Sequence, residues 1–237
     1  MSWDDVIGHE VVKRIWQAHL AEGCVSNAYL LAGPEGIGKR RLALEMAKAL
    51  NCTDSLRPRR SSDVSGAVPS EAGPGLPPAW ALPSPPRAER GAPGSVAGRV
   101  EGCDQCATCL QIAKGTHPDV HAVVPGGASQ QIHIEDIRYI IGRISLRPFS
   151  ARTQVVVLDG AERLTEEAAN SLLKSLEEPS ASTHFLLVTA HLSHCLPTIT
   201  SRCQIIRCRP LLREAVEKML LASQACEAAS AAAVARL

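Results

Sequence analysis

AYLLAGPEGIGKRRLALEMAKAL, residues 28–50, decides the fold of this chain, because it reads as a buried strand, a glycine loop and an amphipathic helix in direct succession. Gly33, Gly38 and Lys39 fit the pattern G-x-x-x-x-G-K, in which backbone N–H groups close around phosphate oxygens and the lysine reaches the outer phosphates. Gly36 lies inside the same loop. One narrow apolar stripe follows, as on a helix that packs against a sheet: Leu42, Ala43, Met46, Ala47 and Leu50. The stretch therefore predicts a P-loop.

One position of this loop departs from the usual pattern. The residue after the lysine is ordinarily Ser or Thr, whose hydroxyl ligates Mg²⁺, whereas this chain has Arg40. A guanidinium cannot ligate a metal ion, although it is a good partner for phosphate. We therefore expect a P-loop fold at which ATP binds weakly or not at all. The alternative is an ordinary glycine-rich turn between a strand and a helix.

The composition excludes several classes of protein. With 237 residues the chain can form one large domain or two small ones around a real core. Its 25 basic and 24 acidic residues nearly balance, so no overall field favours nucleic acid or membrane, and 3% aromatic residues argue against a base-stacking surface. The sequence shows neither a secretory signal nor an apolar run of membrane-spanning length. We expect a cytoplasmic protein whose nine cysteines bind metal or stay reduced.

The rest of the chain alternates between helical and strand patterns. Apolar spacing predicts helices at about 9–22 and 135–144, and a third helix that Thr165 caps and Pro179 ends. Apolar runs predict strands at 119–124, 154–159, 184–190 and 204–208. Strands that alternate with helices imply the α/β class with an open parallel sheet.

Residues 54–99 interrupt this pattern. Nine of the sixteen prolines of the chain fall here among Ser, Gly, Ala and Arg, without periodicity. Such a composition predicts disorder. An interaction segment and a translated non-coding insertion both fit the sequence.

A cluster of cysteines follows the insert. Cys103, Cys106 and Cys109 form C-x₂-C-x₂-C, three thiolates close enough to share one ion. Cys52, directly after the P-loop helix, is the candidate fourth ligand if the insert loops out, and His117 is the weaker option. An iron–sulfur cluster is the rival, although the C-x₃-C-P ending of that pattern is missing, and unliganded thiols are a third interpretation. We expect a structural Zn²⁺ site, because four protein ligands leave no open coordination position.

A second set of residues resembles the metal side of a nucleotide site. Asp159 ends VVVLD, where a carboxylate would bind Mg²⁺ at the carboxyl edge of the sheet. The next residue, which in an ATPase of this type is a water-activating Glu, is Gly160, and the nearest glutamate is Glu162. Thr189 ends the neighbouring strand as a candidate phosphate sensor. The alternative is a core strand that merely ends in Asp.

Together these motifs resemble one family, the delta-prime subunits of the bacterial DNA polymerase III clamp loader, which are AAA+ proteins. The resemblance runs from about residue 5 to 211 without the insert. It rests on IGHE at 7, NAYLLAGPEGIGK at 27, HPDV at 117, IHIEDIR at 132, VVVLDGAERLTEEAANSLLKSLEEP at 155 and LPTITSRCQIIRCRPL at 196. Asn27 stands where the family usually has His, and the 54–99 insert within the zinc module is unusual.

The resemblance implies a domain organisation. Residues 1–210 would form the AAA+ core, with a zinc module between residues 52 and 109 whose ligands are Cys52, Cys103, Cys106 and Cys109. Residues 211–237 would begin a helical lid, without the collar domain that builds the pentamer of this family.

The resemblance also implies a role. Ser201-Arg202-Cys203 matches the SRC motif, whose arginine acts in trans on the ATP of a neighbouring subunit, although a lone loop arginine is usually solvated. The chain would be a stator that does not hydrolyse ATP, with the gamma/tau and delta subunits as partners and the sliding clamp and primed DNA reached through the complex.

One alternative is that the chain is the gamma/tau motor itself. Arg40 and Gly160 argue against it, since the motor has Thr or Ser and Glu at these positions. Another is a standalone zinc or iron–sulfur regulatory protein on a P-loop scaffold.

Overall fold

The computed structural model describes residues 3, 6–54, 101–127, 129–180 and 182–222. The predicted disorder of the 54–99 insert therefore falls, apart from Asp54, outside the described residues. The predicted lid is described only as far as residue 222.

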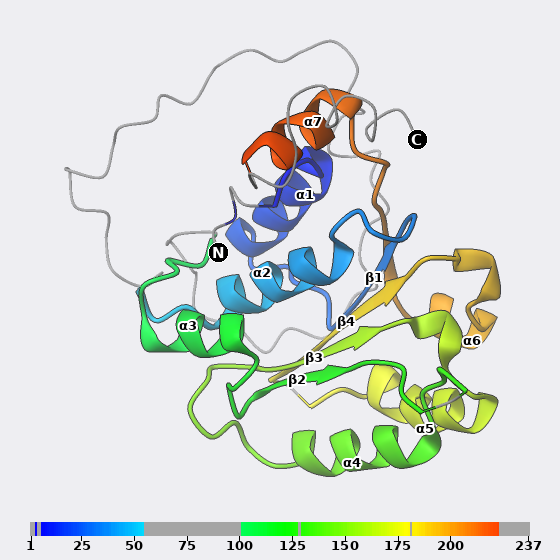
Figure 1. Ribbon diagram of the computed structural model, residues 1–237. Coiled ribbons are helices and arrows are strands. Elements are labelled where there is room, and N and C mark those ends of the chain that lie inside the picture. Colours follow the sequence, from blue (N-terminus) through cyan, green and yellow to red (C-terminus); the bar gives the residue numbers. More distant parts are fainter. Residues whose placement is uncertain (1–2, 4–5, 55–100, 128, 181, 223–237) are drawn as a thin grey trace.

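A five-stranded parallel sheet forms the centre of the molecule, in the order β2-β3-β4-β1-β5 (Figure 1). Its strands are Ala28–Ala32 (β1), Val120–Val123 (β2), Gln154–Asp159 (β3), Thr183–Thr189 (β4) and Gln204–Arg207 (β5). The central strands read as continuous apolar runs because helices cover both of their faces. The predicted open parallel sheet is confirmed, and the predicted strands agree with the observed ones to within about a residue.

Helices lie on both faces of the sheet (Figure 1). On one face are Glu10–Ala21 (α1), Lys39–Asn51 (α2) and Ala107–Lys114 (α3). On the other are Ile134–Ile144 (α4) and Glu166–Glu177 (α5). Alternate residues of each strand point to opposite faces. Leu31 thus joins the core under α1 and α2, and its neighbour Leu30 joins the core over α4 and α5.

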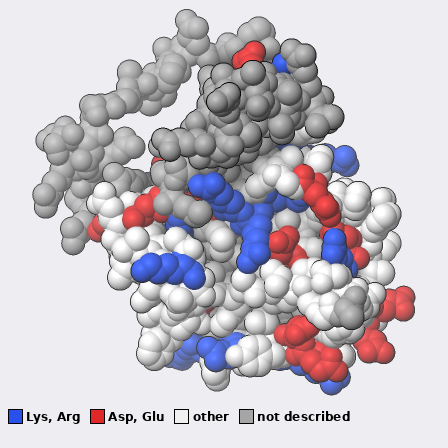
Figure 2. All heavy atoms as spheres, in the orientation of Figure 1, with Lys and Arg blue, Asp and Glu red and all other residues white. Residues whose placement is uncertain are grey.

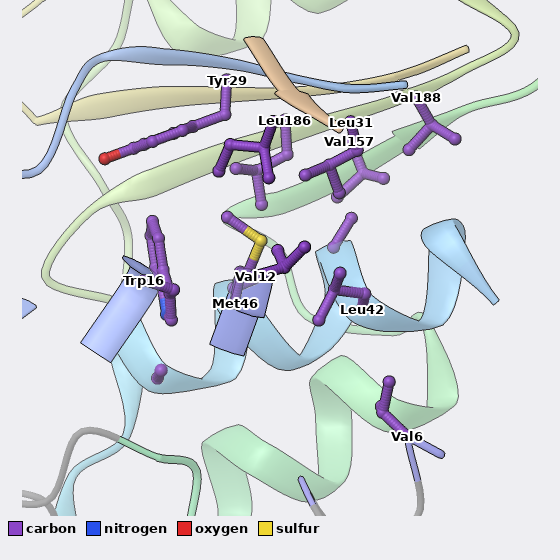
Figure 3. Close-up of a cluster of buried hydrophobic side chains, with 14 of the residues drawn as sticks. Val6, Val12, Trp16, Tyr29, Leu31, Leu42, Met46, Val157, Leu186 and Val188 are labelled. Carbon is purple, nitrogen blue, oxygen red and sulfur yellow. The ribbon is translucent and has the colours of Figure 1, made fainter. Parts of the chain in front are cut away.

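The first core contains the predicted stripe of the P-loop helix. Leu42 and Met46 are fully buried and face strand residues such as Leu31 and Leu186 (Figure 3). Trp16 of α1 closes the same cluster and contacts Tyr29 edge-on, with ring centroids 5.3 Å apart. Each buried side chain of this size stabilises the fold by about 1.5–3 kcal/mol. This packing fixes where the P-loop lies relative to the ends of the strands.

Caps define the helices of the second core. Thr165 caps the amino end of α5, and its hydroxyl accepts a hydrogen bond from the N–H of Ala168 at 3.2 Å, as the sequence predicted. Asp136 accepts from the N–H of His133 at 3.1 Å at the start of α4. α4 buries the apolar side that its spacing predicted, with Ile141 half-buried beside it: Ile137, Ile140 and Ile144.

Shorter elements complete the chain: the 3₁₀ turns Ala161–Arg163 (η5) and Leu192–His194 (η6), and the helices Pro197–Thr200 (α6) and Arg213–Ala222 (α7). Acidic and basic side chains are interspersed on the face drawn in Figure 2, in keeping with the balanced composition. Within the described ranges, no helix has the length and apolar character needed to cross a bilayer.

Candidate functional site

The P-loop connects β1 to α2, and its shape depends on glycine. A Cβ atom at Gly33 would lie 2.3 Å from the carbonyl oxygen of Cys208, so no larger residue fits there. Gly38 has a φ of 92° where it precedes α2, a conformation that side chains disfavour. Lys39 begins the helix, is 6% exposed and donates to the carbonyl of Pro34. Burial lowers the pKa of Lys39 below its usual value, against the opposing effect of nearby carboxylates.

A pocket of about 630 Å³ opens beside this loop. Gly36 and Gly38 line it from the loop, and Asp159 and Gly160 line it from the end of β3. Its charged lining consists of the cations Lys39, Arg40, Arg41 and Arg163 and the carboxylates Glu35, Asp159 and Glu162. The structure therefore brings the predicted P-loop and the predicted metal-binding carboxylate to one place.

Arg40 reaches the carboxylate that a metal ion would need. Its Nε lies 3.9 Å from Oδ2 of Asp159. Gly160 has a φ of 84°, and a Cβ there would lie 2.9 Å from Cγ of Pro125. The backbone at this position is thus shaped for glycine, so a catalytic glutamate cannot be added there without strain.

Thr189, the candidate phosphate sensor, ends β4, and Glu162 contacts the residue that follows it. Thr189 is fully buried, and its hydroxyl accepts from the N–H of His191 at 3.2 Å and from the thiol of Cys195 at 3.3 Å. Its neighbours Val188 and Ala190 line the pocket instead. Glu162 also lines the pocket, and its Oε1 accepts from the N–H of Ala190 at 3.3 Å. The hydroxyl of Thr189 is thus engaged within the protein interior.

Four cysteine sulfurs meet beside the carboxyl end of α2. The sulfurs of Cys52, Cys103, Cys106 and Cys109 all lie within 4.8 Å of one another, although 50 residues separate Cys52 from Cys103. Tetrahedral Zn²⁺ with sulfur ligands at about 2.3 Å needs sulfur–sulfur separations of about 3.8 Å, so small side-chain movements suffice to close the site. The four residues are in position to hold a metal ion. Among the described residues, His117 lies outside this cluster, and its Nδ1 accepts from the N–H of Asp119 at 3.1 Å.

Hydrogen bonds favour thiolate at Cys52 and Cys106 of this cluster, whereas burial raises the pKa of Cys103 to about 11. Backbone N–H groups of Cys103, Cys106 and Cys109 point at the sulfurs of Cys52, Cys103 and Cys106, at 3.2–3.4 Å. The Cys109 thiol donates to Cys52, which lowers the pKa of Cys52 and raises that of Cys109. Thiolate is the form that binds metal.

A buried ion pair joins the cysteine cluster to the P-loop helix. Lys48 of α2 is 1% exposed, and its Nζ lies 2.7 Å from Oε1 of Glu45 and 2.6 Å from Oδ1 of Asp104. Asp104 stands between the first two cysteines of C-x₂-C-x₂-C. A Cβ at Gly102 would lie 2.8 Å from Cβ of Lys48, so the loop lies directly on the helix. The cysteine cluster and the P-loop are thus joined to the same helix, α2.

Arg202 lies at the end of the sheet where the parallel strands begin, whereas the pocket lies at the end where they finish. It precedes β5, whose first residue pairs with Tyr29 near the start of β1, whereas the P-loop follows the end of β1. A strand of five residues is about 16 Å long. Arg202 donates from Nε to Oε1 of Glu177 at 2.5 Å, and its side chain is 33% exposed. It therefore cannot reach a phosphate bound at the P-loop of its own chain.

Sequence reasoning missed several of these residues. Arg41 and Arg163 line the pocket, Glu177 binds Arg202, and Lys48 anchors the cysteine loop. Arg41 could have been noticed because it follows Lys39 and Arg40 directly in the first turn of α2. The others carry no local signal, since each depends on a contact with a distant part of the chain.

Comparison with known proteins decides the family. The sequence matches the family described as "DNA polymerase III, delta subunit" over residues 8–67 and 94–212. The chain belongs to this family. The match resumes before the cysteine cluster, so it includes the P-loop, all four cysteines and Arg202.

Other DNA polymerase III subunits are similar along most of the chain. The Pseudomonas aeruginosa subunit delta′ is 32% identical over 201 residues, which are 85% of this chain and 46% of that protein. The Bacillus subtilis subunit delta′ is 28% identical over 93% of this chain and 54% of that protein. The Bacillus subtilis subunit tau is 29% identical over 85% of this chain and 28% of that protein. The chain spans about half the length of the two delta′ relatives.

A solved structure supports the fold. The Thermotoga maritima RuvB Holliday junction branch migration motor superposes with a TM-score of 0.52 at 18% identity, over 99% of this chain and 58% of that one. The chain therefore shares the α/β fold of that structure, with the parallel sheet described above.

Proposed function

We propose that this chain is a clamp-loader subunit that does not hydrolyse ATP and that assists ATP-driven loading of the sliding clamp onto primed DNA. In this role it is a stator, which offers Arg202 to the ATP of a neighbouring gamma/tau subunit. Residues 1–210 are the AAA+ core, and residues 211–237 begin the lid. Membership of the delta family and similarity to the delta′ and tau subunits support this proposal.

The observation that carries the proposal is the separation of Arg202 from the pocket of its own chain. Arg202, whose side chain is 33% exposed, lies at the end of the sheet where the strands begin, and the P-loop lies at the end where they finish. In phosphoryl transfer, negative charge spreads over the γ-phosphate oxygens, and an arginine supplied across an interface raises the rate by roughly 10³- to 10⁵-fold. An arginine that cannot serve its own site is suited to that task.

The pocket itself argues against the gamma/tau motor as an alternative. A motor needs a hydroxyl at residue 40 to ligate Mg²⁺ and a carboxylate at residue 160 to activate water. Arg40 is instead paired with Asp159, and the backbone at Gly160 is shaped for glycine. We therefore assign negligible ATP hydrolysis to this chain.

The cysteine cluster has a structural role in this proposal. Zn²⁺ is held by Cys52, Cys103, Cys106 and Cys109, a donor set that leaves no open position for substrate. The ion ties the loop before α3 to the end of α2. A standalone regulatory metalloprotein, the second alternative, would use the same site but would bind no loader subunit.

The partners are the gamma/tau and delta subunits in the cytoplasm, with clamp and DNA reached through the complex. The test measures sedimentation of the chain mixed with the gamma or tau subunit of the same organism, with and without ATP, and phosphate release by the chain alone. We expect a stable complex and turnover below about 0.1 s⁻¹, against the 1–10³ s⁻¹ usual for enzymes. Faster turnover would favour the interpretation as a gamma/tau motor subunit. Absence of a complex would favour the standalone metalloprotein.

A further inference from the structure

The residues beside the P-loop do not fit Mg²⁺. In P-loop proteins a hydroxyl after the lysine and a carboxylate at the end of a neighbouring strand hold the metal beside the phosphates. Here the hydroxyl is replaced by Arg40, which has N–H donors and no lone pair for a metal. The carboxylate, Asp159, is paired with the same arginine at 3.9 Å. The hydroxyl ligand for Mg²⁺ is thus missing, and the carboxylate of Asp159 already pairs with the guanidinium of Arg40.

This ion pair is free to accept a further partner. The side chain of Arg40 is 53% exposed and that of Asp159 is 32% exposed. Exposed ion pairs of this length are weak and exchange readily. Since a guanidinium carries five N–H donors, Arg40 can bind phosphate oxygens while it stays beside Asp159.

The charge of the pocket lining also favours an anion without metal. Four cations face three carboxylates, and one of the cations, Arg163, is itself paired with Glu35 at 3.6 Å between Nη2 and Oε1. The lining is therefore positive by one charge. With Ser or Thr in place of Arg40 it would be neutral, and a metal ion would have to offset the phosphates.

We propose that this pocket binds the phosphates of a nucleoside di- or triphosphate without Mg²⁺, and that Arg40 takes the place of the metal between phosphate and Asp159. The pocket volume suits a ligand of nucleotide size. The glycine loop and the first turn of α2 supply N–H donors to the same phosphates. This proposal does not depend on the stator role, which needs no bound nucleotide.

The test is calorimetric titration of the isolated chain with ADP and with ATP, in EDTA and in Mg²⁺. We expect affinity in EDTA to equal or exceed that in Mg²⁺, because the metal reduces the charge that attracts the phosphates to the lining. Pyrophosphate is titrated in parallel and should bind more weakly than ADP, since it lacks the nucleoside.

Three variants make the test specific. Arg40→Thr should weaken binding in EDTA by about 10- to 100-fold, since hydrogen bonds to charged groups are lost. Asp159→Asn should strengthen binding in EDTA by up to about fivefold, because the carboxylate that competes for Arg40 is gone. Arg138→Thr, at an exposed position on α4 at the other face of the sheet, is the matched control and should change nothing.

Several outcomes would overturn the proposal. Binding that requires Mg²⁺ and that Asp159→Asn weakens in the Mg²⁺ buffer would mean that Asp159 still holds a metal, and weaker binding of Asp159→Asn in EDTA would contradict the competition between Asp159 and phosphate for Arg40. Absence of binding at millimolar ADP in both buffers would mean that the pocket takes no nucleotide. Pyrophosphate that binds as tightly as ADP would make the site one for inorganic phosphates. None of these results bears on whether the chain joins the loader, so the two proposals fail separately.

Discussion

The guanidinium of Arg202 is bound by the carboxylate of Glu177 within the same chain. Nε and Nη2 both contact Oε1 of Glu177, and Nη1 donates to the carbonyl of Thr198 at 2.9 Å and to the hydroxyl of Ser201 at 3.2 Å. Most of the five N–H groups are therefore engaged. Arg202 can grip a phosphate with two hydrogen bonds only after it releases Glu177.

If Arg202 acts in trans as proposed, Glu177→Gln should raise ATP hydrolysis in a loader that contains this chain. Glutamine keeps the shape of the contact but removes the charge that competes with phosphate. An exposed ion pair contributes up to about 1 kcal/mol, so the increase should be no more than about fivefold. Steady-state phosphate release measures it, with the exposed neighbour Glu178→Gln as control. A decrease would instead make Glu177 a residue that positions Arg202.

Cys106→Ser should abolish stoichiometric zinc in protein purified without added metal, because three thiolates rarely hold structural zinc as tightly as four. The exposed Cys24, which lies outside the cluster, gives the matched control Cys24→Ser, and this variant should keep its zinc. Elemental analysis of both proteins is the measurement. Stoichiometric iron with visible absorbance in the unaltered chain would identify an iron–sulfur cluster instead.

Lys48→Met should lower the free energy of unfolding by about 3–5 kcal/mol, because it leaves the buried carboxylate of Glu45 unpaired. The hydrogen bonds that Lys48 donates to Asp104 and Glu45 outweigh burial and raise the pKa of Lys48, so the lysine is charged in the folded protein. Lys13 forms the same i,i+3 contact with Glu10, which is 67% exposed, and Lys13→Met should cost about 1 kcal/mol or less. Urea unfolding compares the two. Equal costs would show that Lys48 and Glu45 are not effectively desolvated.

Asp119→Asn should destabilise the protein in a pH-dependent way. The carboxylate accepts from the N–H groups of Phe149, Ser150 and Ala151 at 2.7–2.8 Å, and these bonds outweigh burial and lower the pKa of Asp119. A pKa lowered on folding contributes stability above the unfolded value of about 3.9, and this stability is lost as pH falls through the folded pKa. Asn should cost about 1.5–3 kcal/mol at pH 7, and the difference should shrink below about pH 4. Unfolding curves from pH 3 to 7 measure it, and a difference that is constant over this range would contradict this account of Asp119.

Local patterns in the sequence predicted the helices and strands and the sides that they bury. The spacing of Leu42 and Met46 indicates which side of α2 packs against the sheet. The apolar run that ends in Asp159 indicates a strand that is covered on both faces. Thr165 could be recognised as a cap because it bonds to an N–H only three residues away. These features could be predicted because they depend only on periodicity within one element or on residues a few positions apart.

Contacts between distant segments could not be predicted in the same way. The pair formed by Arg40 and Asp159 exists because β3 and β1 lie on either side of β4, an order that no local pattern specifies. Arg202 meets Glu177 because α5 and α6 return to the same edge of the sheet. The cysteine spacing predicted a metal centre, but its attachment to Lys48 became evident only from the fold.

Steady-state ATP hydrolysis by loaders assembled with unaltered, Arg202→Ala and Arg202→Lys chains tests the trans-acting role of Arg202 most directly. Both variants should fold, keep their metal and join the loader as the unaltered chain does. In the Arg202→Ala loader, hydrolysis at the one interface that Arg202 serves should fall by at least about 10³-fold. The total rate of ATP hydrolysis, stimulated by DNA and clamp, should therefore fall by the amount that this one site contributes. Lys should rescue poorly, because a point charge cannot bind two oxygens in a fork. Unchanged hydrolysis and clamp loading in the Ala loader would contradict the role and leave Arg202 as a surface residue held by Glu177.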